Sequence, residues 1–206
     1  MILEEVKSAF NENKLAIYVS IAILFISLVL GYFLEPHLYG YFNPVVEDLT
    51  HKVQQGTIKL TFQSIFLNNI KIVFTMFIFG VTCFFSGVIL GFNGFFAGYY
   101  VATTDDMLVT MLLIVPHGIF EFSSCILACA SGFVLFNFLF KFIKTLNRQD
   151  NGPVKELLLN SFDASSDKLK QAITLLIIAS ILMAIAGFVE VYLTLPIAEF
   201  LYSFLT

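Results

Sequence analysis

The chain has 206 residues, of which 58% are hydrophobic and 13% charged, and its mean hydropathy is +0.88. A soluble globular domain is about 45–50% apolar and about 25% charged, so this composition excludes an ordinary water-soluble domain and places the surplus apolar side chains against lipid. The net charge of −4 and the lack of a basic tail exclude nucleic acid as an expected partner.

The N-terminal part predicts a surface helix followed by a membrane span. Residues 1–14 place their apolar side chains on one helical face, which is typical of a helix lying at the membrane interface. Residues 15–34 form an apolar run as long as a full span and longer than the core of a cleavable signal, so we interpret it as a retained signal anchor. Pro36 is predicted to end this helix.

The middle of the chain is harder to divide into spans. Residues 38–69 interleave charged and apolar side chains and are expected to form an amphipathic connector. Two apolar runs follow, at residues 70–101 and 107–140. One span needs about 20 residues and two spans with a turn need more than about 40. Each run has an intermediate length, which favours broken or half helices in a glycine-rich core at residues 70–140.

A helix break is predicted at Pro116–Gly118, because proline removes a backbone donor and glycine loosens a helix. The polar segment before the second run separates it from the first. A helix is expected to begin near Met107, with Thr104 or Asp105 as its N-cap.

Two topologies are compatible with these features. The preferred one has two full spans flanking a re-entrant pair of short helices, with four full spans in all and the N-terminus outside. Its four central elements are expected at residues 70–88, 93–101, 107–115 and 119–140. In the other topology residues 92–115 cross the membrane, which gives five spans and an N-terminus inside. Asp105 and Asp106 would then lie within the membrane, which is energetically costly.

The C-terminal third sets the expected sidedness. Residues 141–171 carry six of the eleven Lys and Arg residues and are expected to form a cytoplasmic loop. Residues 172–194 form the last span. The predicted fold is therefore all-α: a polytopic transmembrane helical bundle of four or five spans, one membrane domain over residues 1–206, located in the cell membrane as a multi-pass protein.

Glycines recur on one helical face of the first long run. They are spaced 7, 4, 3 and 4 residues apart, at Gly80, Gly87, Gly91, Gly94 and Gly98. Glycine lets helix backbones approach closely in lipid, so the stripe predicts either tight packing within one subunit or a homodimer interface. Its continuity also indicates that the helix persists through residues 92–93, which conflicts with the re-entrant hairpin.

Five polar side chains fall within predicted membrane segments, at Asn69, Asn93, His117, Glu121 and Glu190. Burying a charged group at the centre of a span costs about 2.5–3.5 kcal/mol, so each is a candidate functional residue. His117 and Glu121 are four residues apart and would share a helix face, where they could exchange a proton. Alternatively, Glu121 caps a helix that begins at the proline break. Glu190 is either interfacial or paired inside the bundle, and surface solvation would explain Asn69.

The sequence contains no nucleophile elbow, P-loop, zinc-protease or CxxC motif, so no enzymatic activity is expected. Its three histidines lack ligand spacing, and we predict neither a metal site nor a cofactor. Cys83, Cys125 and Cys129 lie in apolar runs and are interpreted as packing residues.

Residues 67–196 resemble the stage II sporulation protein M family of integral membrane proteins. The resemblance is carried by Asn69, the glycine series, Asn93-Gly94, the segment PHGIFE ending at Glu121, and GFVEVYLTLP with Glu190. It implies a membrane protein without catalytic activity of its own. In endospore formers the named member associates with cell-wall-degrading partners during engulfment. The family also occurs in organisms that do not sporulate, so that role is not carried over.

Two functional hypotheses follow. In the first, the protein is a membrane scaffold or complex-organising subunit whose partners are the lipid bilayer, further copies of itself in a homo-oligomer and other membrane proteins. In the second, it is a transporter or channel with a polar site at the broken helices around His117 and Glu121. The residues name no substrate.

Overall fold

The computed structural model describes residues 2–55, 61–148 and 152–205, and this part of the chain is helical without any strand. Five helices are long and apolar enough to cross a membrane. They are α2 (Lys14–Gln54), α3 (Phe62–Phe79), α4 (Phe84–Ala102), α5 (Met107–Leu146) and α6 (Val154–Tyr192). The all-α membrane fold is therefore confirmed, and the described residues support five spans rather than four.

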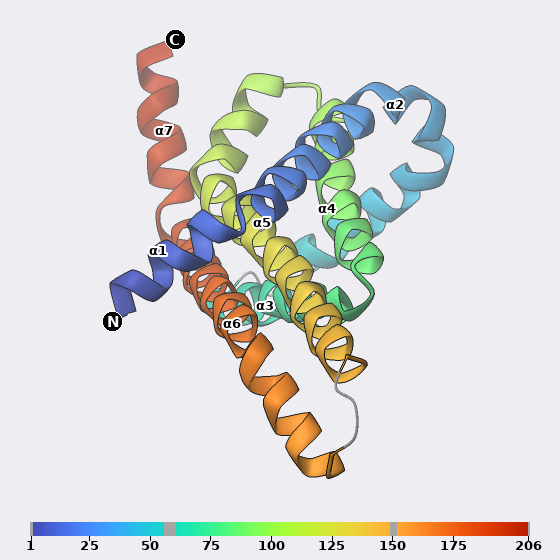
Figure 1. The fold of residues 1–206 in the computed structure, drawn as a ribbon. Coiled ribbons are helices and arrows are strands. Elements are labelled where there is room, and N and C mark those ends of the chain that lie inside the picture. The colour runs from blue at the N-terminus through green and yellow to red at the C-terminus, as the bar shows by residue number, and fades with distance from the viewer. Residues whose placement is uncertain (1, 56–60, 149–151, 206) are drawn as a thin grey trace.

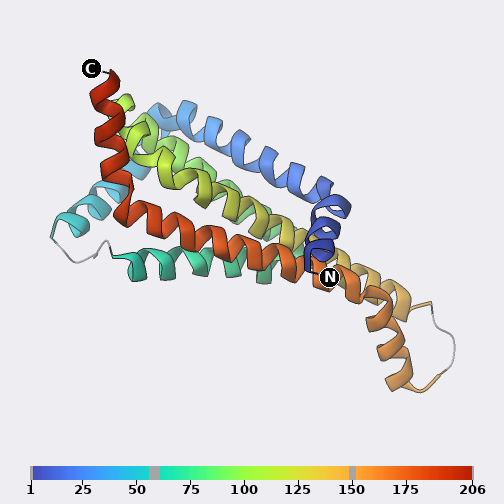
Figure 2. The same cartoon turned by 90° about the vertical axis from the view of Figure 1, so that its left-hand side faces the viewer.

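The five helices alternate in direction along the bundle (Figures 1 and 2). The short helix α1 (Ile2–Glu12) lies at the end where α2 begins and contacts α6, and the last turns of α5 and the first turns of α6 project beyond this same end (Figure 2). The C-terminal helix α7 (Thr194–Leu205) stands at the opposite end. The two termini thus lie at opposite ends of the bundle.

Pro36 does not end the first long helix, contrary to the prediction. Helix α2 contains both Pro36 and Pro44 and continues to Gln54. A proline removes one backbone hydrogen bond, but a bent helix can continue when the flanking bonds are kept. Figure 1 shows that α2 turns back on itself in this part, so that its last turns cross the end of the bundle towards α3. Residues 56–60 of the predicted connector lie outside the described residues.

The first apolar run is divided at Gly80–Cys83, not between residues 88 and 93. Helix α3 begins within the predicted connector, where the Thr61 side chain caps it by accepting a bond from Ser64 N. It ends in the 3-10 turn η1 (Gly80–Thr82), and Cys83 follows with a positive φ of 59°. Helix α4 then runs unbroken through the glycine stripe, so the predicted short helix at residues 93–101 is only its C-terminal half.

The predicted break at Pro116–Gly118 is also absent, because α5 is continuous across it. The helix begins at Met107 as expected, but its cap is Asp106, whose side chain accepts a bond from Val109 N at 3.0 Å. Asp105 and Asp106 are exposed in the turn between α4 and α5. In the five-span topology they lie in the turn between two spans and not within a span, so the objection to this topology falls.

The basic segment at residues 141–171 is mostly helical and not a loop. Helix α5 continues to Leu146 and α6 starts at Val154, so the two helices form a hairpin that projects from the bundle (Figure 2). The most extensive helix contact is between α5 and α6, followed by that between α2 and α4.

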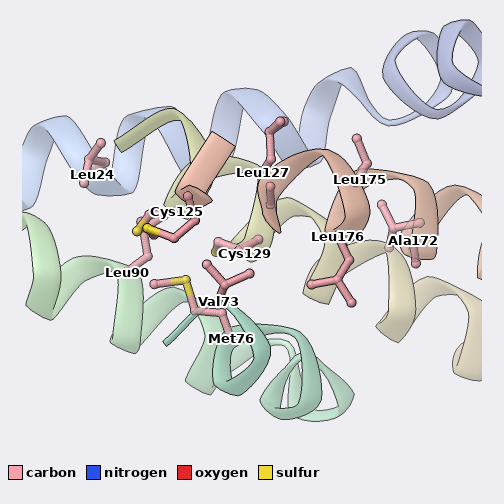
Figure 3. Packing of buried hydrophobic residues seen from close by; sticks show 14 of the residues in the cluster. Leu24, Val73, Met76, Leu90, Cys125, Leu127, Cys129, Ala172, Leu175 and Leu176 are labelled. Atoms are coloured by element: carbon pink, nitrogen blue, oxygen red, sulfur yellow. The ribbon is translucent and has the colours of Figure 1, made fainter. Parts of the chain in front are cut away.

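The buried core joins α2, α3, α4, α5 and α6. Figure 3 shows part of it, including Leu24, Val73, Met76, Leu90, Cys125, Cys129 and Leu175. Cys125 and Cys129 are free buried thiols in this cluster. They lie among apolar side chains, where small polarizable residues pack well.

The glycine stripe is used within the chain. A Cβ atom on Gly98 would lie 2.0 Å from the Leu28 carbonyl oxygen, and one on Gly80 would lie 2.3 Å from Cα of Gly132. Gly94 abuts Ser27 of α2, while Gly87 and Gly91 face the Ile23 side chain at 3.3 and 3.7 Å. The stripe therefore fits α4 against α2 and joins the end of α3 to α5, and it no longer argues for a homodimer.

Candidate functional site

Three ionisable side chains meet between α5 and α6. One ring nitrogen of His117 and one carboxylate oxygen each of Glu121 and Glu190 lie within 4.8 Å of one another, and all three residues are partly buried. The helical spacing on α5 predicted the closeness of the first two. Glu190 joins them because the end of α6 packs against this part of α5. We call His117, Glu121 and Glu190 the polar cluster.

Asn69 of α3 approaches the polar cluster from a third helix. Its Nδ2 atom donates to Oε1 of Glu121 at 3.4 Å, across 52 residues of sequence. Surface solvation is therefore not the explanation for Asn69, which is half-buried and faces a carboxylate. The long bond orients Glu121 and leaves its second oxygen available for another partner.

Thr194, at the start of α7, holds His117. The Nδ1 atom of His117 and Oγ1 of Thr194 are 3.3 Å apart, and the same hydroxyl donates to the Val189 carbonyl at 3.1 Å. A hydroxyl has one hydrogen, so Thr194 accepts from Nδ1–H of the histidine. The Nε2 atom then keeps its lone pair. Thr194 could not be predicted from the sequence, because no local pattern connects residues 77 positions apart.

A cavity of about 290 Å³ opens beside the cluster, between α4 and α5. Its polar lining includes Asn93, His117 and Glu121, and its walls are aromatic. Asn93 is a wall residue here, because its amide donates to the Ile89 carbonyl at 2.9 Å within its own helix. It shares a cavity with the polar cluster but makes no hydrogen bond to it.

A second cavity, of about 530 Å³ between α3 and α4, shares Phe92 and Asn93 with the first. Its lining includes Asn68, Lys71 and Thr75. The two hollows therefore meet at Asn93 and place polar groups along one side of the bundle. Such a lining is expensive next to lipid and is usual where water or protein covers it.

The proposed capping role of Glu121 is wrong. Helix α5 begins at Met107, so this glutamate lies in the middle of a continuous helix whose backbone N–H groups are already bonded. Neither a helix end nor a break explains the acid at this position.

The family model described as "Stage II sporulation protein M" matches residues 18–195 of this chain. This range includes the polar cluster, Asn69 and Thr194. The chain belongs to the stage II sporulation protein M family. It is 31% identical over 160 residues to the "Uncharacterized protein MJ0793" of Methanocaldococcus jannaschii, covering 75% of this chain and 82% of the relative. It is 28% identical over 215 residues to "Uncharacterized protein MJ0706" of the same organism, covering 97% and 90%. No solved structure matches.

Membership in the stage II sporulation protein M family supports the multi-pass membrane architecture. The names of the two archaeal relatives give no activity for either protein.

Proposed function

We propose that this member of the stage II sporulation protein M family is a non-enzymatic membrane transport protein that binds a small cation at the polar cluster. The proposal rests on one observation: two carboxylates and an imidazole converge within a bundle of membrane-spanning helices. A charged side chain within a span costs up to about 2.5–3.5 kcal/mol, the value at the span centre. Helix packing alone is achieved more cheaply by apolar side chains, as elsewhere in this bundle.

The position of the polar cluster supports access from one side. Glu190 lies two residues before the end of α6, at Tyr192, and Asn69 lies in the first half of α3. Both helix ends are at the end of the bundle opposite the basic α5–α6 hairpin (Figure 2). The positive-inside rule puts that hairpin in the cytoplasm. The cavity beside the cluster is thus proposed to open towards the outer side, with the N-terminus inside.

Single-cysteine labelling tests whether water reaches the polar cluster. In a background with the three native cysteines replaced by serine or alanine, Asn93→Cys, His117→Cys and Glu121→Cys are exposed in turn to a membrane-impermeant thiol reagent. Intact cells and inverted vesicles present the two sides. Arg148→Cys on the exposed hairpin is the positive control, and Ser131→Cys, at 0% exposure on the same helix α5, is the dry control.

We expect positions 117 and 121 to react from the outer side and position 131 to remain unlabelled. If neither 117 nor 121 reacts from either side while 148 does, the cluster is dry and the transport proposal falls.

A second candidate function is a scaffold that organises a complex, and the projecting α5–α6 hairpin favours it. The hairpin exposes apolar side chains, with Val154 71% and Leu159 52% exposed, close to the basic residue Lys155. Partner membrane proteins or further copies of the chain would bind there on the cytoplasmic side. Photo-crosslinking from position 159 tests this candidate: a discrete adduct is expected, and crosslinking to lipid alone would contradict it.

A further inference from the structure

We propose that the cation bound at the polar cluster is a divalent transition-metal ion, ligated by His117, Glu121 and Glu190; this rests on the proposed function. The three residues offer one nitrogen and two oxygen ligands from two adjacent helices. Metal bonds of about 2.0–2.2 Å place ligand atoms at most about 4 Å apart. The ligand atoms now lie within 4.8 Å of one another. Side-chain rotations that move these atoms by about 1 Å would therefore bring them to metal-binding distance without any movement of the helices.

The donor set favours a transition metal over the alkaline-earth ions. Magnesium and calcium prefer oxygen ligands throughout, and calcium takes six to eight of them. Imidazole together with carboxylate suits Zn²⁺, Mn²⁺ or Fe²⁺. Three protein ligands also leave coordination positions open, which a transported ion requires, since it must exchange its ligands to enter and leave.

Two neighbours act as positioning residues for these ligands. The hydrogen bond from His117 Nδ1 to Thr194 Oγ1, at 3.3 Å, leaves Nε2 of the imidazole free to bind a metal. The Asn69 amide, 3.4 Å from Glu121 Oε1, holds one oxygen of that carboxylate. Outer-shell bonds of this kind fix the tautomer and orientation of metal ligands, and their removal typically weakens metal binding by about 10–100-fold.

The cavity beside the cluster provides an approach for the ion. It is lined by both His117 and Glu121, and Gly118 between them adds no side chain to its wall. An ion in the cavity would meet these two ligands first. Glu190, which does not line that cavity, would complete the site from α6.

The test is metal binding by the purified full-length protein in detergent. Co²⁺ serves as a spectroscopic probe of nitrogen and oxygen ligation, and Zn²⁺ affinity is measured by titration calorimetry. Glu190→Gln and His117→Gln are expected to weaken Zn²⁺ binding by more than about 100-fold, beyond the outer-shell range. Glu199→Gln is the matched control, because Glu199 is an exposed carboxylate on α7 outside the polar cluster.

Thr194 gives a second measurement that separates ligand positioning from general stability. Thr194→Val is expected to weaken Zn²⁺ binding by about 10-fold, and Thr194→Ser, which restores the hydroxyl, to recover it. Equal loss of binding in both variants, with both folded by size-exclusion chromatography, would contradict the positioning role.

The outcomes distinguish this inference from the transport proposal. Zn²⁺ binding equal in Glu190→Gln and the native protein, or stronger binding of Mg²⁺ and Ca²⁺, overturns the metal site even if cysteine labelling shows water at the cluster. If Zn²⁺ binds at the cluster but the thiol reagent reaches positions 117 and 121 from neither side, the metal site is supported and the transport proposal is rejected.

Discussion

The contact between α2 and α4 is made of backbone against backbone, whereas the contact among α3, α5 and α6 at the polar cluster is made of side chains. In the first, Gly94 and Gly98 allow α4 to lie directly on carbonyl groups of α2. In the second, Glu121 and Glu190 face each other with an amide and an imidazole beside them. The first contact depends on shape and the second on chemistry. One added methyl group should break the first, while the second should tolerate isosteric changes that abolish binding.

The largest effect is expected from Gly98→Ala. Its new methyl group would meet the Leu28 carbonyl oxygen at 2.0 Å, and a backbone atom cannot rotate away. Overpacking of this kind costs about 3 kcal/mol. The measurement is thermal unfolding in detergent, followed by loss of the monodisperse peak.

Gly91→Ala is the matched control for that experiment. Its methyl group would lie 3.7 Å from a flexible Ile23 methyl group, and alanine favours a helix over glycine by about 0.5–1 kcal/mol. This variant should be as stable as the native protein or slightly more so. Equal stability of the two alanine variants would show that the α2–α4 contact is looser than the structure indicates.

The polar cluster should respond in the opposite direction. Glu121→Gln keeps the oxygen that accepts from Asn69 but removes a carboxylate that faces Glu190 in a partly buried site. Removing one of two facing carboxylates relieves their like-charge repulsion, which we expect to stabilise the fold by about 1 kcal/mol. We expect a higher melting temperature without metal and a smaller gain on adding Zn²⁺ than the native protein shows. A lower melting temperature in metal-free buffer would mean that the glutamate holds the bundle together.

Tyr99 of α4 combines a tightly packed side chain with a buried polar group. It is 0% exposed against α2, and its hydroxyl has no hydrogen-bond partner among the described residues. An unsatisfied buried hydroxyl costs about 1 kcal/mol or more, so Tyr99→Phe should raise the melting temperature modestly. A clear decrease would reveal a hidden partner for the hydroxyl.

The sequence predicted the fold class and the polar residues better than the helix ends. The start of α5 at Met107 follows from local chemistry, since short polar residues precede an apolar run. Pro36 and Pro116 looked like breaks but lie inside continuous helices, because a helix can bend and continue past one missing backbone bond. The true reversal, at Gly80–Cys83, contains no proline and depends on the positive φ of Cys83.

The residues of the polar cluster also differ in how far the sequence could predict them. His117 and Glu121 are one helical turn apart, so their closeness was predictable from spacing on one helix. Glu190 and Thr194 reach them only through the packing of α6 and α7 against α5. No periodicity within one segment carries that information. The convergence of these side chains therefore becomes visible only when separate helices are placed together.

The smallest effect is expected from a change at Glu12, which makes a partly exposed polar contact between α1 and α6. Hydrogen bonds from Gln171 first, then Ser8 and Lys168, lower the pKa of Glu12 from 4.5 to about 2. The Glu12 carboxylate lies 3.3 Å from Lys168 Nζ, and its side chain is 55% exposed, so water screens the interaction.

A lowered pKa means that the folded state favours the ionised form of Glu12. Its contribution is complete above pH 4.5 and is lost as the pH falls towards about 2. We therefore expect the protection factors of the α1 amides, which are corrected for the intrinsic pH dependence of exchange, to fall across this window in the native protein, while Glu12→Gln shows a flatter dependence. The polar cluster, measured in the same samples through exchange in the middle of α5, should be unaffected by Glu12→Gln. If Glu12→Gln changes hydrogen exchange in both regions, α1 and the polar cluster are coupled through α6. The water-facing and buried polar contacts would then not be independent of each other.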